Sequence, residues 1–221
     1  MTKKSILFTR PNHDYETSCL HYFSKNLVDE IRYVGEYKVI NLEGSKANKK
    51  EFEKNIKKVE PRLVVLNGHG NKDTICGHKD EIILEEDNIN LLQSKIAYVI
   101  ACDSSEKLGD IAIEKGNADA YVGYDAYFMV VADPTRSSSL SKDKNIKVFK
   151  KPYAAMVLSL VSGKNVRESI SDTKDILRSL IREYGVYGIR DKYGDAPLIR
   201  FALFWDLHFL KGYGNLSSSL S

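Results

Sequence analysis

Two short apolar segments constrain the fold of this chain most strongly, because turn-forming residues bound both of them. Residues 63–66 read Leu-Val-Val-Leu and run out through Asn-Gly into His69-Gly70. Residues 96–101 read Ile-Ala-Tyr-Val-Ile-Ala and end at Cys102, which Asp-Ser-Ser follows. Apolar runs of this length are typical of central strands in a parallel sheet that is covered on both faces. The sequence therefore predicts two buried strands that each lead to a reactive side chain.

His69 and Cys102 are predicted to meet at one edge of that sheet, where the carboxyl ends of parallel strands lie and ligands bind. A cysteine is a nucleophile as the thiolate, and a histidine beside it can take its proton or protonate a leaving amine. The backbone N–H groups of Gly70 and Cys102 are suited to hold the oxyanion of an acyl transfer. A helix that begins directly after Cys102 would favour the thiolate. The pattern thus indicates a thiol nucleophile and its base.

Strand and helix patterns alternate along the rest of the chain. Apolar runs predict further strands at residues 5–9, 37–42, 118–124 and 199–205. Apolar positions three and four residues apart predict helices at residues 15–34, 47–59, 106–115, 153–161 and 166–182, and Asp14 is the expected cap of the first. This order predicts an α/β fold, a three-layer sandwich with a mostly parallel sheet of about six strands and helices on both faces.

The chain is expected to form one domain over residues 1–214. Residues 132–151 contain a serine run and four lysines, and they are expected to form a mobile loop. The serine-rich tail, residues 215–221, is expected to be disordered.

The residues around His69 and Cys102 resemble the caspase-like (clan CD) cysteine peptidases, and most of all the bacterial CHAT-type peptidases. The shared pattern is a strand ending in His-Gly, an acidic short helix at residues 86–92, and a strand ending in Ala-Cys. The small-residue strand at 120–123 and the Ser-Gly-Lys turn at 162–164 also match, so the resemblance covers about residues 60–185. It implies a cysteine endopeptidase with His69 and Cys102 as the catalytic dyad and Gly70 in the oxyanion hole.

Substrate preference does not follow from the resemblance. The Gln-Ala-Cys-x-Gly signature of true caspases is absent, and tyrosines at 124 and 127 stand where the family commonly has a tryptophan. Asp103 or Asp125 is instead a candidate to attract a basic P1 side chain. Segment 132–151 has two interpretations. The first is a plain connection. The second is a loop that is cut at Arg136 or a lysine, because caspases carry their processing linker at this position.

The resemblance also implies a biological setting. CHAT-type peptidases act on one dedicated protein substrate, often in bacterial defence or regulated cell death. A protein substrate, an activating partner protein, and a monomeric or homodimeric state are therefore expected here.

Two alternatives remain open at this stage. The first is a catalytically inactive caspase-like module that binds partners or serves as a scaffold. The second is a zinc-stabilised adaptor that uses His69, Cys76, His78 and Cys102, which are ligand types that zinc prefers. The gap between Cys76 and His78 is shorter than usual zinc spacings, so we predict no metal and no cofactor.

Charge and cysteine content limit the other functions. The formal net charge is +3, from 33 basic and 30 acidic residues that are spread along the chain, so nucleic-acid binding is not indicated. Three cysteines without a repeating spacing do not form a disulfide framework. The short apolar stretch after the first four residues does not predict a signal peptide, and no run approaches the roughly 20 apolar residues of a membrane span. A cytoplasmic protein is expected.

Overall fold

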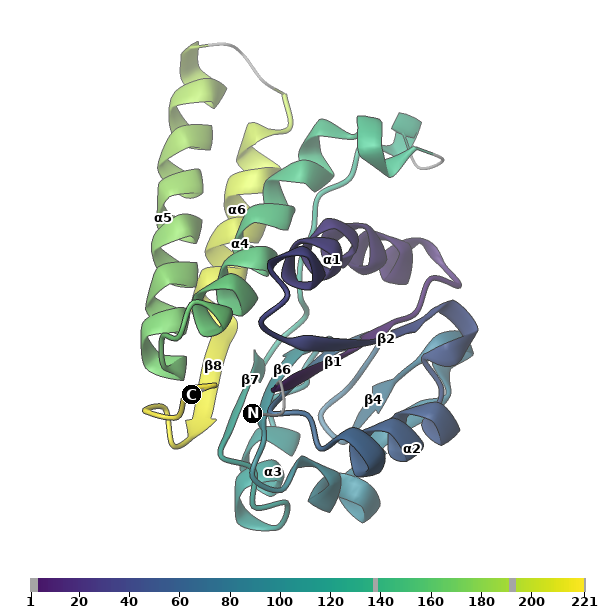
Figure 1. Ribbon diagram of the computed structural model, residues 1–221. Coiled ribbons are helices and arrows are strands. Elements are labelled where there is room, and N and C mark those ends of the chain that lie inside the picture. Colours follow the sequence, from purple (N-terminus) through teal and green to yellow (C-terminus); the bar gives the residue numbers. More distant parts are fainter. Residues whose placement is uncertain (1–3, 137–138, 191–193, 221) are drawn as a thin grey trace.

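The structure is a computed structural model that describes residues 4–136, 139–190 and 194–220. Its centre is a six-stranded sheet in the order β2-β1-β3-β6-β7-β8 (Figure 1). The first five strands in that order are parallel, and β8 runs antiparallel to β7 at the edge. The six strands are β1 (Ser5–Arg10), β2 (Lys38–Glu43), β3 (Leu63–Asn67), β6 (Ile96–Ile100), β7 (Ala120–Tyr124) and β8 (Leu210–Gly214).

Helices cover both faces of this sheet (Figure 1). One face carries α1 (Tyr15–Val34), α4 (Lys144–Val161), α5 (Val166–Arg190) and α6 (Ala196–Phe209), whose apolar residues share a core with Ile6 and Phe8. The other face carries α2 (Lys49–Val59) and α3 (Leu108–Glu114), which pack against Leu7 and Val64. A small hairpin of β4 (Thr74–Cys76) and β5 (Ile82–Glu85) lies beside this second layer. None of the described helices is both long and apolar enough to cross a lipid bilayer.

The predicted α/β sandwich with a mostly parallel six-stranded sheet is confirmed. Every residue of β1, β3, β6 and β7 is buried, as expected of strands that are covered on both faces. Alternate side chains along β1 enter opposite cores, which is why these strands read as continuous apolar runs.

The prediction of a strand at residues 199–205 is wrong, because this segment lies within α6. Ile199, Ala202, Leu203 and Asp206 are buried at three- and four-residue steps, which is the period of a helix. Leu198, Phe201 and Phe204 are more than half exposed on the opposite side, so apolar residues occupy both faces and hide the period. The sixth strand is β8, directly after this helix.

The expected mobile loop at residues 132–151 is also partly wrong. The side chain of Asp143 accepts hydrogen bonds from the N–H groups of Asn145 and Ile146 and caps α4, which begins at Lys144. The lysine-rich half of the segment is therefore helix, and Pro152 lies inside α4. Short 3-10 turns form at Pro134–Arg136 and Leu140–Lys142, and residues 137–138 lie outside the described residues.

The tail is ordered rather than disordered in its described part, residues 215–220. The carbonyl groups of Leu216 and Ser218 accept hydrogen bonds from the backbone at the start of α5. The guanidinium of Arg62 donates to the carbonyl of Ser219, and Leu220 is 1% exposed. These contacts hold the tail to the body of the protein.

Candidate active site

Adjacent strand ends bring His69 and Cys102 to the same edge of the sheet. β3 and β6 are parallel neighbours, with Asn67 opposite Ile100 in the register. His69 follows β3 by two residues and Cys102 follows β6 by two residues, so both leave the sheet at its carboxyl edge. This arrangement is the one that the two apolar runs predict.

Close packing fixes the loop that carries His69. The N–H of Gly68 donates to the carbonyl of Ile100 across the strand ends at 3.4 Å. A Cβ on Gly68 would lie 1.9 Å from the carbonyl oxygen of Cys76, and a Cβ on Gly70 would lie 2.9 Å from the Cβ of Ala101. Both glycines are thus required by close approach of their neighbours, and Gly70 lies against the residue before Cys102.

A cavity of about 80 Å³ lies between the two candidate catalytic residues. Helix α1, the two strand ends and the segment after β7 supply its walls, which include His69, Cys102, Thr17, Cys19 and Phe128. A water molecule occupies about 30 Å³, and small-molecule sites are typically about 300–1,000 Å³. The cavity therefore has room for a few waters, and a peptide would require the segment that carries Phe128 to move.

Asp14 is a third residue of the site. Its Oδ2 lies 2.6 Å from Nε2 of His69, and its Oδ1 accepts the N–H of Thr17 at the start of α1. Burial raises the pKa of Asp14, but hydrogen bonds from Thr17 and His69 outweigh this effect and lower it to about 2. The carboxylate is therefore ionised at neutral pH and can only accept, so Nε2 of His69 carries the proton and Nδ1 is the basic nitrogen.

The sequence alone predicts Asp14 only as a helix cap. The missing information was the strand order: β1 lies next to β3 on the side away from β6, so the residues that follow β1 reach the same sheet edge as His69. An acidic residue shortly after the first strand is the signal that could have identified it.

The Cys102 thiol is held in its neutral form. Burial raises its pKa, and the N–H of Phe128, which donates to the sulfur, offsets this only in part. The expectation of a helix end beside the sulfur is wrong, because residues 102–107 form turns and α3 begins at Leu108. Among the described residues no hydrogen bond joins His69 to Cys102, so activation of the thiol requires a change in this part of the site.

The turn after Cys102 is anchored to the end of β7. Asp103 has a φ of 52°, in the left-handed region that disfavours residues with a side chain. Its N–H donates to the carbonyl of Ala126, and the N–H of Ser105 donates to that of Tyr124. Within the described part of the chain, no acceptor is recorded for the N–H of Gly70 or of Cys102. Both remain candidates for the oxyanion hole.

The predicted specificity residues do not line the cavity between His69 and Cys102. Asp103 lies in the turn itself, and Asp125 lies near Lys174 and Tyr213, where its charge helps to raise the pKa of Tyr213 after burial. Arg136 ends an exposed 3-10 turn. The four predicted zinc ligands are not gathered either: the described ligand atoms near His69 belong to His13, Asp14 and Asp80.

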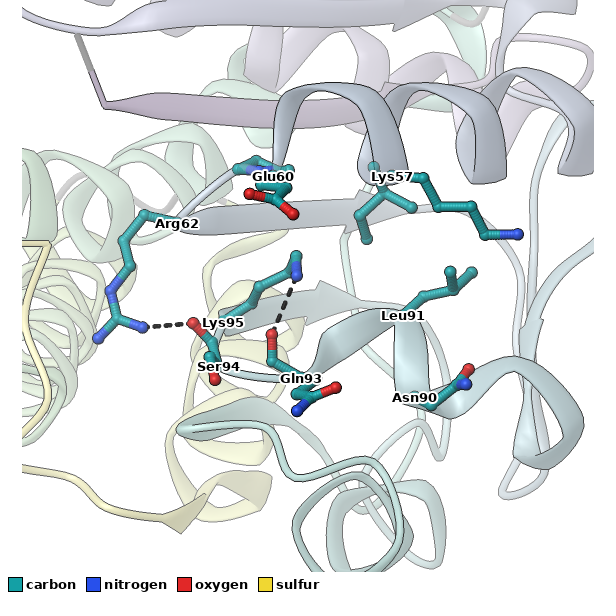
Figure 2. A pocket seen from close by; sticks show the side chains of 10 residues that line it. Lys57, Glu60, Arg62, Asn90, Leu91, Gln93, Ser94 and Lys95 are labelled. Carbon is teal, nitrogen blue, oxygen red and sulfur yellow. Dashed lines mark hydrogen bonds between the residues drawn. The ribbon is translucent and has the colours of Figure 1, made fainter. Parts of the chain in front are cut away.

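A larger surface pocket, of about 550 Å³, lies at the opposite edge of the sheet. Figure 2 shows Arg62, Ser94 and Lys95 around it, where β3 and β6 begin. Arg62 donates to the carbonyl of Ser94 at 2.6 Å, and Lys95 donates to that of Gln93 at 2.9 Å. Among the described residues, no thiol or imidazole lines this pocket, so its size does not make it a rival site for nucleophilic chemistry.

Asp206 anchors the segment that covers Cys102. Its Oδ1 accepts the N–H of Met129 at 2.9 Å, and its side chain is buried in α6. Burial raises the pKa of Asp206 well above the usual range of an aspartate, and the bond from Met129 only partly opposes this. The folded protein therefore retains a proton on Asp206 that the unfolded chain releases above about pH 4.

We expect the free energy of unfolding to fall as the pH rises from about 4 through the raised pKa of Asp206. The change is on the order of 1 kcal/mol or more, since each unit of pKa shift corresponds to about 1.36 kcal/mol. In Asp206→Asn this component should disappear, because the amide keeps the acceptor oxygen and does not ionise. Urea unfolding of both proteins between pH 5 and pH 8 measures it, with the exposed Asp175→Asn as the matched control. Equal pH slopes in all three proteins would contradict the assignment.

Comparisons with known proteins give structural similarities and no match in sequence. No family model matches the chain, and no curated protein sequence matches it. Among solved structures, the chain is similar to a caspase-1 from Spodoptera frugiperda, with 14% sequence identity and a TM-score of 0.47. The match covers 79% of this chain and 75% of that chain. Similarity at this level carries no conclusion about activity, which has to be argued from the residues of the site.

Proposed function

We propose that this protein is a cysteine endopeptidase with Cys102 as nucleophile and His69 as general base and acid. The observation that carries the proposal is that the thiol and the imidazole line one cavity at the carboxyl ends of two adjacent parallel strands. The ionised Asp14 on Nε2 of His69 supports it, because the carboxylate directs the basic nitrogen to Nδ1. A base oriented by a third group is the usual requirement of an activated nucleophile.

The proposed reaction is acyl transfer followed by hydrolysis. His69 Nδ1 takes the proton of the Cys102 thiol, and the sulfur attacks the carbonyl carbon of the scissile peptide bond. The N–H groups of Gly70 and Cys102 hold the resulting oxyanion. The C–N bond then breaks as His69 returns its proton to the leaving amine, which leaves a thioester. Water, deprotonated by His69, hydrolyses the thioester and releases the free thiol and the new carboxylate.

The described conformation is a resting state under this proposal. The small cavity, the raised pKa of Cys102 and the N–H of Phe128 on its sulfur all oppose attack on a substrate. Opening of the segment around Phe128, by a protein substrate or an activating partner, would expose the sulfur and let His69 reach it. Through the resemblance to CHAT-type peptidases, we place this activity in the cytoplasm and in bacterial defence or regulated cell death, with Asp103 or Asp125 selecting a basic P1 residue and Arg136 as a processing site.

The test uses peptidyl acyloxymethyl ketones, which need an active thiol and a correctly placed base. The protein is incubated with four pools that carry Arg, Lys, Asp or Leu at P1, and labelled cysteines are identified by peptide mass. We expect one pool to label Cys102 in preference to Cys19 and Cys76, and His69→Ala to slow this labelling about 100-fold or more, the range of general acid–base catalysis. Cys76→Ala is the matched control and should label as the wild type does. Equal labelling of all three cysteines, with and without His69, would contradict the proposal.

A catalytically inactive binding module is the second candidate. The neutral thiol and the lack of a recorded bond between the described His69 and Cys102 favour it. Under this reading Cys102→Ala changes no biological readout, and no activating partner raises the labelling of Cys102 above that of Cys76.

A further inference from the structure

Five titratable side chains from three separate segments gather beside the candidate base. His13 and Asp14 follow β1, His69 follows β3, and His78 and Asp80 belong to the short 3-10 turn after β4. The rings of His13 and His69 have centroids 6.0 Å apart, and those of His13 and His78 are 5.2 Å apart. Of these five side chains, the catalytic dyad uses only His69 and the cap of α1 uses only Asp14. Neither role accounts for the other three.

Four of these residues present ligand atoms at the spacing of a tetrahedral metal site. One ligand atom from each of His13, Asp14, His69 and Asp80 lies within 4.8 Å of all the others. Nε2 of His13 is 3.4 Å from Oδ2 of Asp14 and 3.4 Å from Oδ1 of Asp80. A tetrahedral Zn²⁺ with bonds of about 2.0–2.2 Å has ligand–ligand edges of about 3.4 Å. Two edges therefore already have the length that zinc requires, and the 2.6 Å contact of Asp14 with His69 has to widen.

The hydrogen-bond network around the cluster is not closed among the described residues. Nδ1 of His13 and Nδ1 of His78 are both buried without a hydrogen-bond partner among the described residues. Buried imidazole nitrogens usually have partners. The 3-10 turn that supplies Asp80 is fixed in place, because a Cβ on Gly77 would lie 2.0 Å from the carbonyl oxygen of Ala47. Two imidazoles and two carboxylates form a donor set that suits Zn²⁺.

We propose that His13, Asp14, His69 and Asp80 form a Zn²⁺ site that switches off the base of the peptidase. Zinc bonds to Nε2 of His69 and displaces the proton of that nitrogen to the solvent, while Nδ1 takes up one proton from the solvent. The imidazole stays neutral with its single proton on Nδ1, so the nitrogen that would accept the thiol proton becomes a donor. Metal binding requires only the four ligands, whereas the inhibitory consequence rests on the proposed peptidase function.

Metal binding is tested first and without any activity readout. We expect Co²⁺ to bind the purified protein at one equivalent with the visible spectrum of a tetrahedral site, and Zn²⁺ to displace it. The Cys102→Ala protein should bind identically, with no thiolate-to-cobalt charge-transfer band in either. Loss of binding in Cys102→Ala, or that band in the wild type, would overturn the proposal by making a thiol the ligand.

Ligand variants locate the site. Asp80 is 64% exposed, so Asp80→Asn is not expected to affect folding, and His13→Gln is the second variant. Each should weaken Zn²⁺ binding at least about 100-fold, because even residues behind the ligands change affinity about 10- to 100-fold. The matched controls are His21→Gln and Asp73→Asn. His21 lies on α1 and pairs with Glu43 of β2, and Asp73 pairs with Lys107. Unchanged affinity in both ligand variants would overturn the site.

The regulatory part is read from the acyloxymethyl ketone labelling of Cys102. One equivalent of Zn²⁺ should slow labelling at least 10-fold in the wild type and in His21→Gln, and should have no effect in Asp80→Asn. Equal labelling with and without bound Zn²⁺ would overturn the switch. If Cys102 is not labelled with a chelator and candidate partner proteins present, the peptidase proposal fails while the cobalt spectra still decide the metal site.

Discussion

Asp14→Asn should lower the rate constant for acyloxymethyl ketone labelling of Cys102 by up to about 10⁴-fold, the loss seen when the acidic member of a catalytic triad becomes an amide. The physical reason is the position of one proton. The Asp14 carboxylate accepts from Nε2 of His69 and leaves Nδ1 basic. An asparagine amide can instead donate to Nε2, which places the proton on Nδ1 and removes the base. The measurement is made with a chelator present, so that metal binding does not contribute.

Stability separates this catalytic effect from damage to the fold. Asp14 caps α1 through the N–H of Thr17, and asparagine is an equally good N-cap. The melting temperature of Asp14→Asn should therefore stay within a few degrees of the wild type, whereas Asp14→Ala should lose about 1 kcal/mol as well as activity. Asp73→Asn is the control for removing an acid near the His69 loop and should retain the wild-type rate. A large rate loss in Asp14→Ala but none in Asp14→Asn would mean that the cap, and not the proton, matters.

The central sheet was predictable because its strands are buried on both faces. The pattern indicates strands clearly because the apolar runs at residues 63–66 and 96–101 are continuous and turn residues mark their ends. The C-terminal region was not predictable from its pattern, because apolar residues there are exposed as well as buried. Helix α6 exposes Leu198, Phe201 and Phe204 while it buries Ile199 and Ala202, so the sequence has no polar face to reveal the helical period. The lysine-rich start of α4 was read as loop because its charged face dominates the composition there.

The sequence pattern predicts which residues of the candidate site follow strand ends, but not which other residues lie beside them in space. His69 and Cys102 stand at strand ends, which the local pattern shows. Asp14, His13 and Asp80 reach the same place only through the order of β1, β3 and the β4–β5 hairpin, which the apolar pattern does not specify. The thiol was expected to be activated by a helix end, and its surroundings instead depend on the segment after β7 that supplies Phe128. The local sequence pattern therefore identifies His69 and Cys102, whereas packing between distant segments decides which groups surround them and what chemistry they can do.

Gly68→Ala should destabilise the fold by about 2–4 kcal/mol, because a new atom would be forced into occupied backbone space. The Cβ would lie 1.9 Å from the carbonyl oxygen of Cys76 and 3.1 Å from its carbonyl carbon. Relief requires the β4 strand to move away from the His69 loop, which breaks the hydrogen bond from the N–H of Cys76 to the carbonyl of His69. The loss is measured by urea unfolding, and Gly194→Ala is the control, because no atom of the described residues lies within 4 Å of its added Cβ.

Gly68→Ala should also affect both sites that use His69, the metal site and the catalytic dyad. Movement of the hairpin displaces Asp80 as well as the loop, so Gly68→Ala should lose Zn²⁺ affinity and Cys102 labelling together. Asp80→Asn, in contrast, loses the metal and leaves the backbone of the loop in place. If the Gly68→Ala protein is as stable as Gly194→Ala, the hairpin can move without loss of stability, and the rigid placement of the His69 loop by close packing of Gly68 is wrong.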